Sequence, residues 1–120
     1  MISRAIEGGK LVIRENDREV LWIDEKRTGD GMRVTLGGQI TASVMDDFED
    51  EMLAILSLRI PIEVDMSEVD HISGGALNVF LFVQKEIDRT SQGSLTIISP
   101  SSPVLRVFDE NGFSDLLDIS

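Results

Sequence analysis

Short apolar runs separated by polar turn residues fill the first third of the chain. The runs are rich in β-branched and aromatic residues, which favours strands over helices. Turns are predicted at Asn16-Asp17 and at residues 28–31 (TGDG), and Gly37-Gly38 is expected to end the strand that follows. The predicted strands are residues 11–14 (LVIR), 20–24 (VLWID) and 32–36 (MRVTL). Because short turns join them, we expect these strands to pair antiparallel.

From Val44 onward the apolar residues recur with the spacing of one helix face. The residues on this face are Val44, Phe48, Met52, Ile55 and Leu56. Ser43 or Thr41 is expected to cap the helix. Acidic residues crowd its first turns, where the helix dipole favours negative charge.

The rest of the chain alternates between strand and helix patterns. Strands are predicted at residues 60–66 and 95–99, with an amphipathic helix over 75–88 between them. A short helix follows, with Ser102 as its cap, proline at its first position and Asn111-Gly112 at its end. Such an alternation implies right-handed crossovers and parallel pairing.

The pattern as a whole therefore predicts the α/β class. We expect a single domain with a mixed sheet, an antiparallel N-terminal hairpin, a parallel βαβ remainder, and helices mainly on one face. A chain of 120 residues that is 42% apolar is suited to one such core.

The amino-acid composition indicates in which environment the protein is expected. No run of about 18 apolar residues is present, so no membrane-spanning helix is predicted. The absence of cysteine excludes disulfides, thiol nucleophiles and thiolate metal sites, and it suits the cytoplasm.

Charge narrows the choice of partners. The formal net charge is −11, from 22 acidic and 11 basic residues, so the chain repels nucleic-acid phosphates and anionic membranes. A basic protein surface is the natural complement. The alternative is that acidity serves only solubility.

The titratable residues indicate neither catalysis nor a metal site. The sequence holds no nucleophile–base set and no phosphate-binding loop, so we expect a protein that is not an enzyme and has no cofactor. His71 is the only histidine and cannot form a zinc site alone; we expect it half-buried, with a sensing role as the alternative. The pairs Asp46-Asp47 and Asp50-Glu51 point in different directions on a helix, which predicts a solvated face. Trp22 is expected to pack within the sheet, with an anchor for a partner at a sheet edge as the alternative.

Three segments, taken in order, carry a family resemblance. They are residues 34–43 (VTLGGQITAS), 62–80 (IEVDMSEVDHISGGALNVF) and 95–117 (LTIISPSSPVLRVFDENGFSDLL). Together they resemble the STAS domain, the family of anti-sigma-factor antagonists and sulphate-transporter tails. The resemblance implies a STAS-like domain over residues 19–120. Residues 1–18 are then an N-terminal extension that adds a strand.

The resemblance also implies a departure from the family's phosphorylation switch. In phospho-switched members the helix start is Asp-Ser-Ser-Gly, and a partner kinase phosphorylates the first serine. Here Ser73 takes the place of the aspartate, Gly74 that of the phosphoacceptor, and Gly75 that of the second serine. Thr41 replaces an aspartate of the neighbouring loop, while Asp65 of the Asp-x-Ser motif is retained. The chain is therefore expected to lack the usual phosphoacceptor serine.

Two features of this helix start stay open from the sequence. Ser73 is either an N-cap or a phosphoacceptor displaced by one position. Gly74 and Gly75 either allow a partner backbone or an anion to approach closely, or only form a tight turn.

By resemblance, the chain is expected to be a cytoplasmic regulatory module that binds a serine kinase or an anti-sigma factor. The alternatives are an accessory subunit bound to a transporter ATPase and a binder of a small ligand or nucleotide. A homodimer is a further alternative for its assembly. The expected partner-binding residues are Gly38, Gln39, Thr41, Ser43, Ser73, Gly74, Gly75, Ala76 and Leu77.

Overall fold

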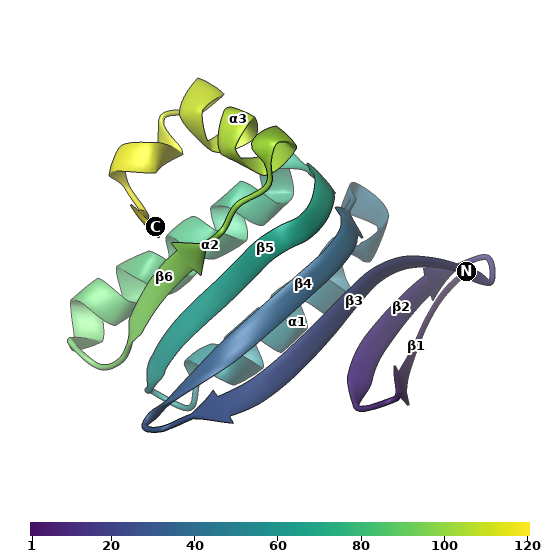
Figure 1. Cartoon of the computed structure of the whole chain (residues 1–120), viewed down its shortest axis with the longest axis horizontal. Helices are drawn as coiled ribbons and strands as arrows, with labels where there is room; N and C mark the ends of the chain where they lie inside the picture. Colours follow the sequence, from purple (N-terminus) through teal and green to yellow (C-terminus); the bar gives the residue numbers. More distant parts are fainter.

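The computed structural model describes residues 1–120 as one seven-stranded mixed sheet with three helices (Figure 1). The strands are β1 (Ile2–Glu7), β2 (Lys10–Glu15), β3 (Arg18–Thr28), β4 (Gly31–Ile40), β5 (Pro61–Ile72), β6 (Ser94–Ile98) and β7 (Asp118–Ile119). The helices are α1 (Met45–Leu56), α2 (Gly74–Thr90) and α3 (Ser102–Glu110). The order of strands in the sheet is the order in the chain. No helix is long and apolar enough to cross a membrane.

The pairing changes from antiparallel to parallel in the middle of the sheet. Strands β1 to β4 pair antiparallel, and β4 to β7 pair parallel. Asn16 and Asp17, with φ of 51° and 65°, form the tight turn between β2 and β3. The predicted class, with a mixed sheet and an antiparallel start, is confirmed.

The helices and one face of the sheet enclose the core. Three phenylalanines, one from each helix, stack edge to face: the ring centroids of Phe48 and Phe80 lie 5.5 Å apart, and those of Phe80 and Phe108 lie 6.3 Å apart. All three side chains are fully buried. Figure 1 shows α1 and α2 together behind the sheet, with α3 near the end of β5.

The opposite face of the sheet carries Trp22 rather than a helix. Its ring lies so close to Gly37 that a Cβ at this glycine would be 2.1 Å from the indole. The ammonium group of Lys10 lies 4.1 Å from the ring centroid. Trp22 therefore packs within the sheet, as predicted.

The same contact explains why β4 is longer than predicted. The sequence placed a strand end at Gly37-Gly38, but β4 continues through both glycines to Ile40. Gly37 leaves room for the indole ring, while Gly38, with φ of +97°, lies at a shift in the pairing with β5. Both glycines lie within the strand, so the predicted strand end is wrong.

The predicted helix caps are also wrong by a few residues. A 3-10 turn, Ala42–Val44, precedes α1, and Val44 is the N-cap of that helix. Neither hydroxyl of the predicted caps bonds to the helix backbone there. Ser101, not Ser102, caps α3: its hydroxyl accepts from the backbone N–H of Val104 at 3.4 Å.

Candidate functional site

The two segments predicted to form a partner-binding surface meet at one edge of the sheet. In the parallel pair β4–β5, Gln39 lies beside His71 and Ile40 beside Ile72. The backbone N–H of Ser73 donates to the carbonyl of Ile40 at 2.9 Å. The carboxyl ends of both strands thus place the loop after β4 next to the start of α2.

The start of α2 has no side-chain cap. Ser73 is the N-cap by backbone conformation, with φ of −85° and ψ of 163°, but its hydroxyl accepts no bond from the helix. Its Oγ is buried and has no hydrogen-bond partner. The predicted capping bond at Ser73 is therefore wrong. The Ser73 hydroxyl therefore accepts no hydrogen bond from the free backbone N–H groups of the first turn of α2.

The fold does not require glycine at either position after Ser73. Gly74 and Gly75 are exposed, and neither has a positive φ. A Cβ at Gly74 would meet nothing within 4 Å, and one at Gly75 would meet the flexible Met45 side chain at 3.2 Å. The helix start is therefore bare, that is, without side chains at its first two positions, although the backbone geometry of the turn would allow them.

The next two residues of the predicted surface belong to the core. Ala76 is 0% exposed and Leu77 is 3% exposed. Their side chains cannot touch a partner. The accessible part of the helix start is therefore Ser73 to Gly75.

A chain of hydrogen bonds ties the loop after β4 to the N-terminal hairpin. The hydroxyls of Thr41 and Ser43 lie 2.8 Å apart, and the Ser43 hydroxyl donates to Oε2 of Glu15 at 2.7 Å. Glu15 was missed from the sequence because it lies 28 positions before Ser43, in a segment outside the family resemblance. The residue belongs to the site nonetheless.

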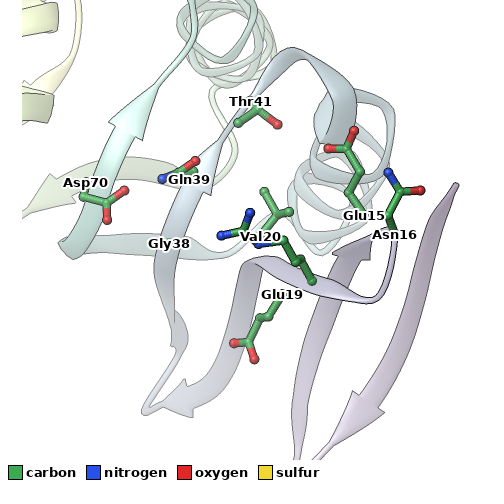
Figure 2. Close-up of a pocket in the computed structure, with 9 residues that line it drawn as sticks. Glu15, Asn16, Glu19, Val20, Gly38, Gln39, Thr41 and Asp70 are labelled. Carbon is green, nitrogen blue, oxygen red and sulfur yellow. The ribbon is translucent and has the colours of Figure 1, made fainter.

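A hollow of about 500 Å³ lies beside this loop (Figure 2). Its walls come from the β2–β3 turn, the ends of β4 and β5, and Thr41. Its charged residues are Glu15, Arg18, Glu19 and Asp70. Three carboxylates against one guanidinium favour a cationic group from outside. Across the chain, no three acidic or histidine residues converge as metal ligands.

Two further motif residues have simple surroundings. Asp65 accepts the backbone N–H of Ser67 through Oδ1 at 2.9 Å, so the retained Asp-x-Ser motif makes a local hydrogen bond within β5, where the pairing with β4 shifts in register. His71 is exposed, so the expected half-buried histidine is wrong. On β5 it follows Asp70, which lines the hollow.

The acidic residues of α1 divide between two sides of the helix. Asp47 and Glu51 face the N-terminal hairpin, where the guanidinium of Arg4 contacts them at 3.2 Å and 3.3 Å. Burial and the neighbouring Glu51 carboxyl raise the pKa of Glu25 on β3 to about 8. The prediction of a wholly solvated acidic face is thus wrong for this side of α1.

Comparison with known proteins gives a family match over most of the chain and one curated relative. A family model described as "Mlab, STAS domain" matches residues 23–118. The anti-sigma-B factor antagonist of Bacillus subtilis (strain 168) is 22% identical over 98 residues, which cover 82% of this chain and 89% of the relative. Residues 1–22 lie outside the family match.

Solved structures share the fold. A putative anti-sigma factor antagonist from Thermotoga maritima matches with a TM-score of 0.69 and 20% identity, covering 81% of this chain and 84% of that one. The anti-sigma factor antagonist SpoIIAA, in its unphosphorylated form, matches with a TM-score of 0.65 and 12% identity, covering 82% and 87%. The phosphorylated form of the Bacillus SpoIIAA matches with a TM-score of 0.61 and 11% identity, covering 82% and 90%.

Proposed function

Because the chain belongs to the STAS domain family, we propose that it is a regulatory module that acts by binding a protein partner, without catalysis of its own. The binding surface consists of the bare start of α2, from Ser73 to Gly75, and the adjacent loop from Gly38 to Ser43. These two segments are joined by the Ser73–Ile40 backbone hydrogen bond.

One observation carries the proposal: α2 begins with two exposed glycines that the fold does not need. In the first turn of a helix, glycine is less favourable than alanine, and open space at Gly74 would accept a side chain without contact. Folding does not explain these two glycines. Close approach of a partner to the helix backbone does, because a side chain at either position would stand in its way.

The vacant phosphoacceptor position belongs to the same proposal. By the family resemblance, Gly74 occupies the place of the phosphorylated serine, and a glycine cannot accept a phosphate. In a phospho-switched relative, phosphorylation adds about −1.5 to −2 charges to this surface. We infer that this chain binds its partner constitutively, unless Ser73 has taken over as the acceptor. The buried Oγ of Ser73 argues against that exchange.

The partner is a protein with a basic surface, because this chain carries a net charge of −11. A serine kinase or an anti-sigma factor fits this proposal, in line with the anti-sigma factor antagonists among its relatives. A transporter ATPase is the alternative partner. Identification of the bound protein distinguishes a kinase or anti-sigma factor from a transporter ATPase, and the following experiment identifies it.

The proposal is tested by comparative affinity purification from the source cells. Wild-type protein and the Gly74→Asp variant serve as baits, and the captured proteins are quantified by mass spectrometry. We expect one partner to be retained by the wild type and lost by Gly74→Asp, because the new carboxylate lies at the centre of the surface.

The Ser102→Asp variant is the matched control, since it adds the same charge to the exposed first turn of α3. It should capture the partner as the wild type does. Equal capture by wild type and Gly74→Asp, with both folded, would show that the start of α2 is not the interface.

A further inference from the structure

A shallow groove between α1 and α2 opens to solvent on their exposed sides. It measures about 360 Å³ and is lined by Glu49 and Leu53 of α1 and by Gly75, Asn78, Val79 and Phe82 of α2. Phe82 is 50% exposed, and it is the only exposed aromatic side chain of the protein. The floor is apolar because Val79 and the half-buried Leu53 lie beside this ring.

The α1 rim of the groove carries unneutralised negative charge. Asp46, Glu49 and Asp50 are exposed, and none of them forms an ion pair. Together with Leu53 they follow the i, i+3, i+4, i+7 spacing of one helix stripe, of which Glu49 and Leu53 line the groove itself. The nearest cation in sequence on α2, Lys85, does not line the groove. An apolar floor with one acidic rim complements a surface that is apolar in the centre and basic at its border.

The groove is continuous with the surface proposed above. Gly75 belongs to both, and Met45, whose side chain lies next to Gly75, joins the start of α1 to the start of α2. An occupant of the groove that extends past Gly75 would therefore reach the bare N–H groups of α2.

We propose that this groove binds one amphipathic helix of the protein partner, with an apolar side chain against Phe82 and Leu53 and basic side chains along the α1 rim. The inference rests on the proposed function and specifies the chemistry of its partner. A helix suits the site because two parallel ridges with an apolar floor between them accept the i, i+3, i+4, i+7 anchors of an amphipathic helix. A second copy of this chain fits poorly, since an isologous contact would bring two acidic stripes together.

A synthetic peptide tests the groove without the natural partner. The probe is an amphipathic helix of about 18 residues, with leucines at the anchor positions and lysines elsewhere. The comparison peptide has glutamate in place of every lysine. We expect the basic peptide alone to bind in fluorescence anisotropy. Its NMR shift changes should centre on Leu53, Gly75 and Phe82.

Two variants and two controls locate the binding. Phe82→Ala removes the apolar anchor and Glu49→Lys reverses charge on the rim, and each should weaken the basic peptide by at least about tenfold. Leu105→Ala and Asp109→Lys make the same kinds of change at exposed positions of α3 and should bind as the wild type does.

Absence of peptide binding, equal binding by Phe82→Ala, or shift changes centred outside the groove would overturn the inference. So would loss of a homodimer in Phe82→Ala, because the occupant would then be a second copy. The natural partner separates the two proposals. If Gly74→Asp loses it while Phe82→Ala and Glu49→Lys retain it, the proposed function stands and the groove assignment fails. If groove variants lose it while Gly74→Asp retains it, the groove stands and the helix-start surface fails.

Discussion

At the scale of single residues, Ser73 and Ser101 occupy the same position before a helix but differ in their bonds. The Ser101 hydroxyl accepts from the backbone of Val104 and donates to the carbonyl of Val69, whereas the Ser73 hydroxyl is buried with no partner. A buried hydroxyl without a partner opposes folding. The two serines therefore contribute to stability with opposite sign.

Alanine substitution measures this difference. We expect Ser73→Ala to leave the melting temperature unchanged or to raise it, because no bond is lost. Ser101→Ala, the matched control, should cost about 1 kcal/mol in chemical denaturation through loss of its cap. A comparable loss in Ser73→Ala would show that its hydroxyl does cap α2 in solution.

The position of Ser73 was predictable from the sequence, but its bonding was not. The strand before it and the apolar spacing after it locate the N-cap within one residue. Whether the hydroxyl turns toward the helix depends on the side-chain rotamer and on packing from β4, which is distant in sequence. The same limit applies to Glu15, whose contact with Ser43 arises only once the sheet has formed.

At the scale of elements, β3 and α1 meet through a carboxyl pair. Glu25 on β3 faces Glu51 on α1, and its pKa is raised from 4.5 to about 8, chiefly by burial and then by Glu51. Between these two pH values the folded protein holds more protons than the unfolded chain. The stability from the protonated Glu25 is thus complete below pH 4.5 and is lost as the pH rises through about 8.

The Glu25→Gln variant isolates this effect. Glutamine is neutral and keeps a donor toward Glu51, so we expect its free energy of unfolding to exceed that of the wild type above pH 8, with the advantage shrinking toward pH 5. Denaturation at a series of pH values measures the difference. Glu110→Gln, on the exposed end of α3, is the control and should run parallel to the wild type. A parallel curve for Glu25→Gln as well would mean that Glu25 is ionised at neutral pH.

The spacing of apolar residues predicted the major helices and strands. Where each of them ends depends on tertiary contacts, which the spacing does not show. The α2 pattern is strongly periodic and predicted that helix to within a few residues. β4 extends past its predicted end. Gly37 leaves room for the Trp22 ring of the neighbouring strand, a contact that the local sequence does not reveal. Two adjacent glycines by themselves indicate a break in the strand. The two-residue strand β7 is too short to leave a pattern in the sequence.

At the scale of the whole molecule, the stacked rings of Phe48, Phe80 and Phe108 connect all three helices. Phe80 is the middle ring and is fully buried. Phe80→Ala should therefore cost about 3–5 kcal/mol of unfolding free energy. Chemical denaturation by circular dichroism measures this loss.

Phe82→Ala is the matched control two positions along the same helix. Its ring is 50% exposed, so the cost should remain below about 1 kcal/mol. Similar losses for the two variants would contradict the placement of Phe80 in the centre of the core. A stable Phe82→Ala protein also secures the use of this variant in binding experiments.

The arrangement of the molecule was predictable in outline because alternating strands and helices leave few ways to build a parallel sheet. The site was predictable in part. The loop after β4 and the start of α2 were correctly expected to be neighbours, since parallel strands end at the same edge. The burial of Ala76 and Leu77 and the groove beside Phe82 depend on how α1 and α2 pack, which one sequence does not specify.

The central claim is that the bare start of α2 binds a protein partner, and one affinity comparison tests it most directly. The partner identified by affinity purification is titrated by calorimetry into wild type, Gly74→Ala and Gly74→Asp. Alanine fits the open space at Gly74, so that variant should fold at least as stably as the wild type. We predict that Gly74→Asp weakens binding by at least about tenfold, or about 1.4 kcal/mol, with Gly74→Ala between the two. Wild-type affinity in a folded Gly74→Asp protein would contradict the account.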